Sequence, residues 1–339
     1  MSLSDKELVV NTTSLTALDG TAVSVLNITD DDISVRQILS QHSNNKASFT
    51  NQIRKWIAHF SSLAGSIRRY RCIRVTYRSN TSFFSQIVPV VLLGRFFSRE
   101  LILSYRSNKA ESELEDYGRG MNPFLKLFHR IEVPCKHTAR VFRQHDLNTV
   151  IVPPVADNIL FPWRHITQVQ PRIVVARRLE RGNNITGLIK AFRFVKQKYP
   201  RAELTIMGDG PQREWIEEMI QTERIQGVTL TGWVTPLEVA KQFANADMYA
   251  NFSTIDGLPL SMLEAISAGL PIVTTHVGDI PSIIENRVNG LLVPINDYNS
   301  LADRIIELIE KPDLAAQLSS ATGKTAFQPS QPSNTSSTS

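Results

Sequence analysis

The sequence predicts an α/β protein with two domains, each built on a sheet of largely parallel strands. The chain has 339 residues, which is enough for two domains of ordinary size. Short apolar runs alternate with amphipathic helical stretches from about residue 171 onward, and a less regular alternation of the same kind occupies residues 71–152. Such alternation is typical of doubly wound sheets, because parallel neighbours need a crossover helix between them.

The second half of the chain has the clearer pattern. A helix over 184–198 carries apolar residues at helical spacing and stops before Pro200, and Thr235 forms a capping box with Glu238 at the start of another. The predicted strands are 172–176, 203–207, 228–231, 247–252, 271–275 and 290–294. The predicted helices are 184–198, 212–223, 235–245, 261–268 and 298–310.

The first half shows the same order of elements in weaker form. The predicted strands are 71–77, 100–105, 130–134 and 149–152, and the predicted helices are 82–97 and 136–145. Residues 1–50 show no clear pattern. Prolines crowd residues 153–171, where we expect the interdomain linker, at about 153–170.

These patterns divide the chain into three parts. Residues 1–160 are expected to form an incomplete Rossmann-like domain, and residues 161–320 a second Rossmann-like domain. Residues 321–339 end in a run of Ser, Thr, Pro, Gln and Asn that cannot bury a core, so we expect a disordered tail.

Charge is distributed unevenly between the halves. Residues 1–170 carry 21 Lys and Arg against 14 Asp and Glu, whereas residues 171–339 carry 16 against 18. The densest basic stretch contains no acidic residue and consists of Arg54, Lys55, Arg68, Arg69, Arg71, Arg74 and Arg78. This stretch suits anionic lipid headgroups or a phosphate-bearing acceptor, and it also suits a solvated helix face.

Composition excludes several classes of protein. The two cysteines, Cys72 and Cys135, form neither a disulfide framework nor a metal-ligand cluster, which suits a reducing cytosol. No signal-peptide pattern opens the chain, and the longest apolar stretch, 87–97, is too short to cross a bilayer. We therefore expect a cytoplasmic protein that contacts the inner face of the membrane at most peripherally, and net charge alone gives no reason to expect nucleic-acid binding.

The strongest site signal is the loop between the predicted strand 247–252 and helix 261–268. Gly257 and Pro259 in this loop let backbone approach a ligand, and the helix start beyond it offers free N–H groups that suit a diphosphate. Asp256 and Glu264 bracket the loop, with seven residues between them. One carboxylate would accept hydrogen bonds from ribose hydroxyls. Ser261 with Glu264 also has capping-box spacing, so capping and ligand contact both remain open for Glu264.

Residues 171–310 resemble the C-terminal domain of glycosyltransferase family 4, whose retaining enzymes have the glycosyltransferase-B fold of two Rossmann-like domains. The family signature is a Glu, seven residues and a second Glu, followed by Ala-x-x-x-Gly-x-Pro-x-Val, and here it runs from Asp256 through Glu264 to Val273. Further matches, in family order, are Arg178-Leu179, Gly208-Asp209-Gly210-Pro211, Gly232-Trp233-Val234, Val277-Gly278-Asp279-Ile280-Pro281 and 289–294.

The resemblance implies a role for each matching position. Glu264 would hold the donor ribose, and Asp256 would lie at the sugar ring. The backbone of Gly257, Leu258, Pro259 and Leu260 would meet the diphosphate, while Gly208, Gly210 and Val234 would line the nucleoside. Arg178 would neutralise charge on the leaving diphosphate, with Arg177 as its neighbour in a register that the sequence leaves uncertain by one.

Three departures from the family pattern matter. Asp256 is one methylene shorter than the usual Glu. Asn183, which is neutral, stands where the family has a Lys for the diphosphate. The expected opening strand with its glycine-rich loop, and the closing helix that crosses back to the first domain, are not recognisable. In the first half, Arg106 within Tyr105-Arg106-Ser107-Asn108 is the best candidate for acceptor or phosphate contact.

The leading hypothesis is a retaining enzyme that transfers a hexosyl group from a UDP- or GDP-linked sugar to a hydroxyl of a glycan or lipid-linked acceptor, in surface polysaccharide or glycolipid synthesis. We expect no cofactor and no metal, since the nucleotide-sugar is a substrate and the family neutralises charge with Arg, Lys and a helix start. The alternative is a nucleotide-sugar-binding or interaction protein derived from such an enzyme and impaired in catalysis. A phosphorylase is disfavoured, because Lys190, Lys196 and Lys198 lack the context of a pyridoxal-binding lysine.

Overall fold

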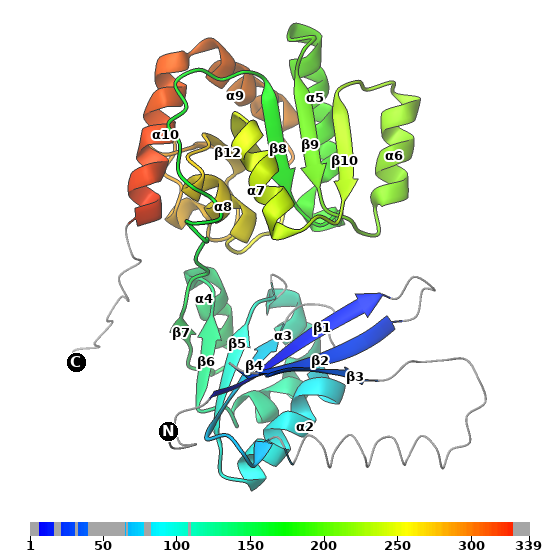
Figure 1. The fold of residues 1–339 in the computed structure, drawn as a ribbon, viewed down its shortest axis with the longest axis vertical. Helices are drawn as coiled ribbons and strands as arrows, with labels where there is room; N and C mark the ends of the chain where they lie inside the picture. The colour runs from blue at the N-terminus through cyan, green and yellow to red at the C-terminus, as the bar shows by residue number, and fades with distance from the viewer. Residues whose placement is uncertain are drawn as a thin grey trace. The chain divides into compact units, whose positions relative to one another are not determined.

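The computed structural model describes residues 7–16, 22–30, 33–39, 65, 67–77, 83–107 and 110–327. The chain divides into two compact units, Met1–Val152 and Pro153–Ser339. Each unit has its own hydrophobic core, and each is described by itself below (Figure 1).

The second unit is a six-stranded, fully parallel sheet in the order β10-β9-β8-β11-β12-β13. Its strands are β8 (Arg172–Ala176), β9 (Glu203–Met207), β10 (Val228–Gly232), β11 (Met248–Asn251), β12 (Ile272–Thr275) and β13 (Leu291–Val293). Every strand predicted for this half is present, with ends that shift by one residue at most. The fully parallel, doubly wound order confirms the predicted fold class.

Helices cover both faces of this sheet. They are α5 (Ile185–Lys198), α6 (Arg213–Thr222), α7 (Pro236–Asn245), α8 (Leu260–Ser267), α9 (Tyr298–Glu310) and α10 (Pro312–Phe327), with 3₁₀ turns η2 (Arg181–Asn183) and η3 (Ile280–Ser282). Figure 1 shows α7 and α8 in front of the sheet and α5 behind it. The expected capping box of Thr235 and Glu238 is formed at the start of α7.

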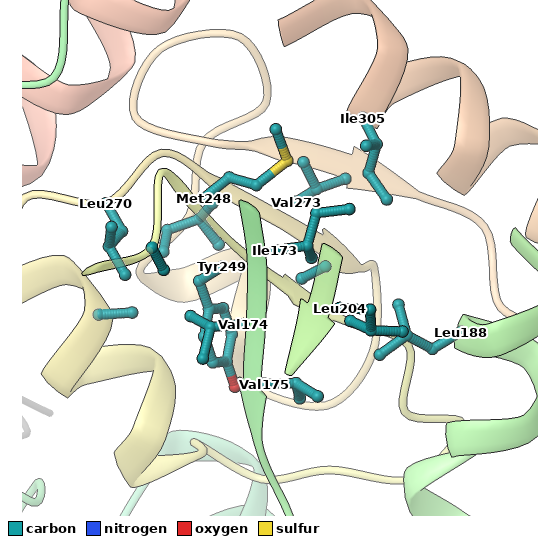
Figure 2. Packing of buried hydrophobic residues seen from close by; sticks show 14 of the residues in the cluster. Ile173, Val174, Val175, Leu188, Leu204, Met248, Tyr249, Leu270, Val273 and Ile305 are labelled. Atoms are coloured by element: carbon teal, nitrogen blue, oxygen red, sulfur yellow. The ribbon is translucent and has the colours of Figure 1, made fainter. Parts of the chain in front are cut away.

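Apolar side chains from both faces of the central strands form the core of this unit. Ile173, Val174 and Val175 of β8 are almost fully buried, as expected for a parallel strand covered on both sides (Figure 2). Leu204, Met248, Tyr249 and Val273 extend this layer from the neighbouring strands, and Leu188 of α5 and Ile305 of α9 belong to the same cluster.

The segment expected to be the interdomain linker belongs largely to the second unit. Phe161, Ile166 and Val169 are buried in its core. The N–H of Ile166 donates to Ser319 Oγ on α10 at 2.9 Å, and Ser267 Oγ donates to the backbone oxygen of Phe161 at 3.1 Å. The expectation of a linker reaching to residue 170 was therefore wrong.

Helix α10 corrects a second expectation. It continues to Phe327, so residues 321–327 are helical and are not part of a polar tail. Residues 328–339, which carry most of the Ser, Thr and Pro of that stretch, lie outside the described residues.

The first unit is a seven-stranded sheet in the order β3-β2-β1-β4-β5-β6-β7. Its strands are β1 (Glu7–Thr16), β2 (Ala22–Asp30), β3 (Ile33–Leu39), β4 (Cys72–Tyr77), β5 (Glu100–Tyr105), β6 (Arg130–Val133) and β7 (Val150–Ile151), and its helices are α2 (Phe83–Phe96), α3 (Ala110–Leu125) and α4 (Lys136–Gln144). The strands from β4 to β7 are parallel and match the predictions.

Residues 7–39 were not anticipated as strands. β1 pairs in parallel with β4, while β2 and β3 add antiparallel strands at one edge. Helix α3 was also missed, because Gly118, Gly120 and Pro123 interrupt its helical pattern.

Candidate functional site

The loops singled out by the sequence meet where the strand order of the second sheet reverses. β8 has β9 on one side and β11 on the other, so the connections after β8 and β11 leave towards opposite faces. In open α/β sheets, ligands bind outside the carboxyl ends of the strands at this point. Arg177 and Arg178 directly follow β8, and residues 252–259 directly follow β11.

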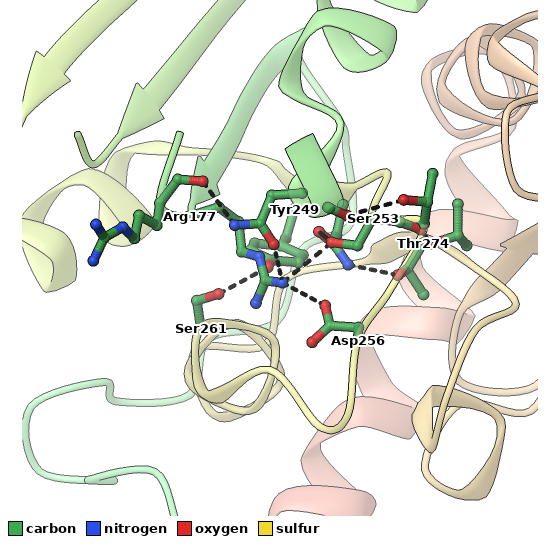
Figure 3. A network of polar contacts seen from close by, with 12 residues as sticks. Arg177, Tyr249, Ser253, Asp256, Ser261 and Thr274 are labelled. Atoms are coloured by element: carbon green, nitrogen blue, oxygen red, sulfur yellow. Dashed lines mark hydrogen bonds and ion pairs between the residues drawn. The ribbon is translucent and has the colours of Figure 1, made fainter. Parts of the chain in front are cut away.

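Arg177 is the centre of a buried polar network at this position (Figure 3). One of its terminal nitrogens donates to Asp256 Oδ2 at 2.6 Å, to Asn183 Oδ1 at 2.5 Å and to Ser253 Oγ at 3.2 Å. The Arg177 side chain is 11% exposed and that of Asp256 only 3%. Arg177 Nε is also buried, and it has no hydrogen-bond partner among the described residues.

Buried hydrogen bonds hold the acceptors of this network in place. Ser253 Oγ donates to Asn251 Oδ1 at 2.8 Å, and Asn251 Nδ2 donates to Thr274 Oγ1 at 3.3 Å. Thr275 Oγ1 donates to the backbone oxygen of Ser253 at 2.7 Å. The loop after β11 is thus fastened to β12, and this gives the Asp256 carboxylate a rigid support.

Asn183, the neutral residue where the resemblance implies a lysine, is part of the same network. It is buried in η2, accepts from Arg177 and donates through Nδ2 to the backbone oxygen of Arg178 at 2.7 Å. Both ends of its amide are therefore used, one to orient the Arg177 side chain and one to fix the loop that follows β8.

The structure brings Arg177, and not Arg178, to Asp256. Arg178 Nε lies 2.5 Å from Glu180 Oε1, and the Arg178 side chain is 45% exposed. The sequence left the register of this pair uncertain by one. Because the contacts of Arg177 come from two other segments, η2 with Asn183 and the loop after β11 with Ser253 and Asp256, no local pattern distinguishes the two arginines.

The capping-box alternative for Glu264 is wrong. Helix α8 begins at Leu260, its N-cap is Pro259, and no side chain caps it. Ser261, the expected capping residue, instead shares a 2.9 Å hydrogen bond with the hydroxyl of the buried Tyr249 on β11. Burial raises the pKa of Tyr249 to about 12, so the phenol stays protonated and available for this bond at neutral pH.

Glu264 is half-buried one turn inside α8, and no described residue donates a hydrogen bond to its carboxylate. Burial raises the pKa of Glu264 above its ordinary value. A half-buried carboxylate without a structural partner, one turn into an uncapped helix, is suited to accept hydrogen bonds from ligand hydroxyls.

Glycines let the surrounding loops approach one another. A Cβ on Gly208, whose φ is +134°, would lie 2.1 Å from the backbone oxygen of Arg177, and one on Gly210 would lie 2.6 Å from that of Leu179. The turn 208–211 therefore packs directly on the loop after β8. Gly278, with φ of +56°, does the same against Asp256, whose backbone oxygen lies 1.7 Å from the position of an added Cβ.

The other predicted donor-site residues lie around these loops. Gly257 and Pro259 are buried, Leu258 is half-buried and Leu260 is exposed at the start of α8. Val234 follows β10, is half-buried and packs on the core. No described group of three or more His, Cys, Asp or Glu residues is arranged to hold a metal ion.

Arg106 lies in the first unit, at the carboxyl end of β5. Its Nε donates to Ser104 Oγ at 3.1 Å, and a terminal nitrogen donates to the backbone oxygen of Val152 at 3.2 Å. These contacts connect the strand end to the last residue of the first unit. Asn108, the last residue of the predicted contact loop, lies outside the described residues.

Sequence reasoning missed a polar cluster beside Arg106. Tyr105 donates to Glu113 Oε2 at 2.5 Å, and Ser107 donates to Glu113 Oε1 at 3.0 Å. Burial, followed by the charge of Glu113, raises the pKa of Tyr105. Tyrosines that end two adjacent predicted strands, Tyr77 and Tyr105, were the available signal for this cluster at the carboxyl edge.

Residues 163–325 match the family model of Glycosyl transferases group 1. This part of the chain is therefore a glycosyltransferase group 1 domain, and the chain has the α/β architecture of glycosyltransferase-B structures. HepE of Anabaena, crystallised with UDP-glucose, superposes with a TM-score of 0.64 at 18% identity, covering 79% of this chain and 76% of HepE.

Curated relatives resemble a smaller part of the chain than HepE does. The alpha-monoglucosyldiacylglycerol synthase of Acholeplasma laidlawii is 26% identical over 219 residues, which is 60% of this chain and 54% of that protein. The amylovoran biosynthesis glycosyltransferase AmsK of Erwinia amylovora is 29% identical over 144 residues, which is 40% of this chain and 35% of AmsK. The matched region thus spans about half the length, or less, of these relatives.

Proposed function

We propose that this protein is a retaining glycosyltransferase of family 4, which transfers a hexosyl group from a nucleotide-diphosphate sugar to a hydroxyl of a glycan or lipid-linked acceptor. In this reaction the bond between the anomeric carbon and the diphosphate breaks, and a bond to the acceptor oxygen forms with the same anomeric configuration. The acceptor proton leaves with the nucleoside diphosphate. The product is expected to be a surface polysaccharide or a glycolipid, and the membrane contact would be peripheral.

The observation that carries this proposal is the Arg177 network at the point where the strand order of the second sheet reverses. This network lies next to the start of α8, which no side chain caps. The leaving diphosphate gains charge as the glycosidic bond breaks, so a cation and oriented N–H groups that are in place beforehand lower the barrier. We assign Arg177 to the diphosphate in place of Arg178, because Arg177 is buried and directed to the site while Arg178 pairs with Glu180.

The remaining assignments follow the family pattern. Glu264 would accept from the ribose hydroxyls, Asp256 would face the sugar ring, and the backbone from Gly257 to Leu260 would meet the diphosphate. Gly208, Gly210 and Val234 would border the nucleoside. Arg106 remains a proposed acceptor-side contact.

Asn183 supports a specific role for Arg177 in this chain. A lysine at this position would bring a second cation to the diphosphate, whereas Asn183 brings none and instead orients the Arg177 guanidinium at 2.5 Å. We therefore propose that the charge on the leaving group is met mainly by Arg177, and that Asn183 is a positioning residue.

The test is a thermal-shift panel with UDP, GDP and ADP, followed by turnover assays with the matching glucose and mannose donors. UDP leads the panel because HepE was crystallised with UDP-glucose. We expect one nucleotide to raise the Tm of the wild type, and Arg177→Ala to lose that rise while Arg178→Ala keeps it. A product with inverted anomeric configuration would exclude the retaining mechanism.

One observation favours the alternative of a binding protein without transfer activity: Arg177 already pairs with Asp256, the carboxylate that would face the sugar. The same experiments separate the two functions. A nucleotide that raises the Tm while no donor is transferred or hydrolysed would support the binding protein.

A further inference from the structure

Helix α2 of the first unit has an unusual outer surface for a helix that covers a sheet. Its inner side buries Ile87, Val90 and Val91 in the core. Phe84, Val88, Leu92 and Phe96 follow one another at intervals of four residues along its outer flank, where Val88 still packs against the core. A surface helix of a water-soluble protein ordinarily carries polar residues there.

The exposure of this line is large. Phe96 is 79% exposed, Leu92 is 52% and Phe84 is 47%, while Val88 is half-buried. The Phe96 ring contacts the ring of the half-buried Phe97 edge to face, at 5.1 Å between ring centroids. Exposure of three large apolar side chains on one helix indicates a surface that meets an apolar partner.

Cations gather at the C-terminal end of the same line. Arg95 lies in the last turn of α2, and Arg99 follows it and donates to the backbone oxygen of Arg68 at 3.0 Å. The Arg68 guanidinium lies over the Phe97 ring at 5.6 Å from its centroid. We call Arg68, Arg69, Arg71, Arg95 and Arg99 the basic edge, because they lie at the amino ends of β4 and β5.

The basic edge is not neutralised within the described part of the chain. None of its five arginines forms an ion pair with a described residue, and Glu100 is the one carboxylate next to them in sequence. Helix α2 itself contains no acidic residue. One or two cations are enough to compensate the dipole at the C-terminal end of α2. The five arginines of the basic edge are more than this compensation requires. Arg54, Lys55 and Arg78 of the same basic stretch lie outside the described residues.

We propose that the outer side of α2, together with the basic edge, docks on an anionic phospholipid surface. The line from Phe84 to Phe96 would enter the interfacial region of the bilayer, and the arginines would meet its phosphate groups. An apolar line bordered by cations is the combination that binds interfacial helices to anionic membranes. A soluble polyanion would use the cations but would gain nothing from Phe96 and Leu92.

The place of this surface in the fold fits an enzyme with a lipid-linked acceptor. Helix α2 runs back from the carboxyl end of β4 to the amino end of β5, so Phe84 lies near the edge of the sheet that carries Tyr77 and Arg106. The proposal does not need the transfer activity, because docking is measured without donor or acceptor.

The experiment is co-sedimentation of the full chain with vesicles of phosphatidylcholine alone or mixed with phosphatidylglycerol. We expect binding that increases with the phosphatidylglycerol fraction and decreases with salt. The double variant Leu92→Ser/Phe96→Ser should bind the mixed vesicles roughly tenfold more weakly, and Arg95→Gln should weaken binding about fivefold. Melting temperatures of the variants should match the wild type, because these side chains are exposed.

Trp215→Ser is the matched control, since Trp215 is an exposed aromatic residue on α6 of the second unit, and it should leave binding unchanged. Absence of binding to the mixed vesicles would overturn the proposal. So would binding that the double variant retains in full. If duplex DNA or heparin competes and the double variant binds these polyanions as the wild type does, the basic edge is a polyanion site and the lipid proposal fails.

Discussion

Arg177 and Arg178 are chemically identical neighbours that differ in everything around them. Arg177 is enclosed by contacts from η2 and from the loop after β11, whereas Arg178 pairs with Glu180 at the surface. A buried ion pair is costly to break, because the remaining charge has no solvent, while an exposed pair is screened. The two residues therefore make a matched pair for mutation.

We expect Arg177→Ala to lower the free energy of unfolding by about 3 kcal/mol, because Asp256 is left buried without its cation. Arg178→Ala should lower it by less than about 1 kcal/mol. Urea denaturation of both variants measures the difference. Equal losses would show that the network around Arg177 does not form in solution.

Glu264 leads to a prediction with a defined pH dependence. Its pKa is raised in the folded protein, so the ionised carboxylate opposes folding, and stability is lost as the pH rises through the folded-state pKa. Glu264→Gln should therefore raise the Tm of the unliganded protein at pH 8 but not below pH 4.5, the ordinary value for a glutamate.

The same variant should lose most of the Tm increase that the nucleotide gives, because the amide is a weaker acceptor for ribose hydroxyls. Glu214→Gln, at an exposed position on α6, is the control for removal of a negative charge. A Glu264→Gln protein that is less stable at pH 8 and still binds nucleotide like the wild type would contradict the assignment.

At the scale of elements, the site depends on how closely loops from separate strands approach. Gly278 has a left-handed backbone and lies against the backbone of Asp256, so the loop after β12 supports the loop after β11. Gly182 in η2 is a different case, because an added Cβ would meet Ile255 only at 3.8 Å, an ordinary contact.

Gly278→Ala should therefore destabilise the protein by at least about 2 kcal/mol and abolish the nucleotide-induced shift, since the residue would be strained and would displace Asp256. Gly182→Ala should retain both stability and binding. Thermal melts with and without nucleotide measure both effects. A Gly278→Ala protein with an unchanged Tm and an unchanged nucleotide-induced shift would mean that the loops after β11 and β12 are not in contact.

Most elements of residues 172–310 were predictable because apolar periodicity and turn residues agree there with the final fold. The exceptions are informative. Helix α3 was not predicted because it contains Gly118, Gly120 and Pro123. These residues have low helix propensity, but the packing of the folded unit tolerates them within the helix. At α8, the spacing of Ser261 and Glu264 left a capping box open as an alternative, but Tyr249 on β11 hydrogen-bonds Ser261 and the helix begins at Leu260.

For the whole molecule, the two separate hydrophobic cores suggest that the units fold independently. The segment from residue 158 to 169 packs on α8 and α10 of the second unit, through Asn158, Phe161 and Ile166. The connection between the units is thereby confined to the first few residues after Val152, among them Pro153 and Pro154. Among the described residues, no helix is long and apolar enough to cross a membrane.

We predict that a fragment of residues 153–327 folds by itself and binds the nucleotide, because it contains its own core and every proposed donor-site residue. Calorimetry should show one cooperative transition that shifts upward with nucleotide. A fragment that starts at residue 171 is the control, and it should be less stable because it lacks Phe161 and Ile166. The absence of a transition in the longer fragment would contradict the prediction.

The sequence by itself determined the parallel α/β fold of the second unit and pointed to the loop from Asp256 to Glu264 as the candidate site, because strand and helix periodicities and glycine-rich turns are local properties of the chain. The tertiary structure decided what depends on contacts between distant segments. It paired Arg177, and not Arg178, with Asp256, placed Asn183 against the Arg177 guanidinium, and left α8 without a capping box that would use Glu264. It also revealed the apolar outer side of α2, since exposure is a property of packing and not of residue type.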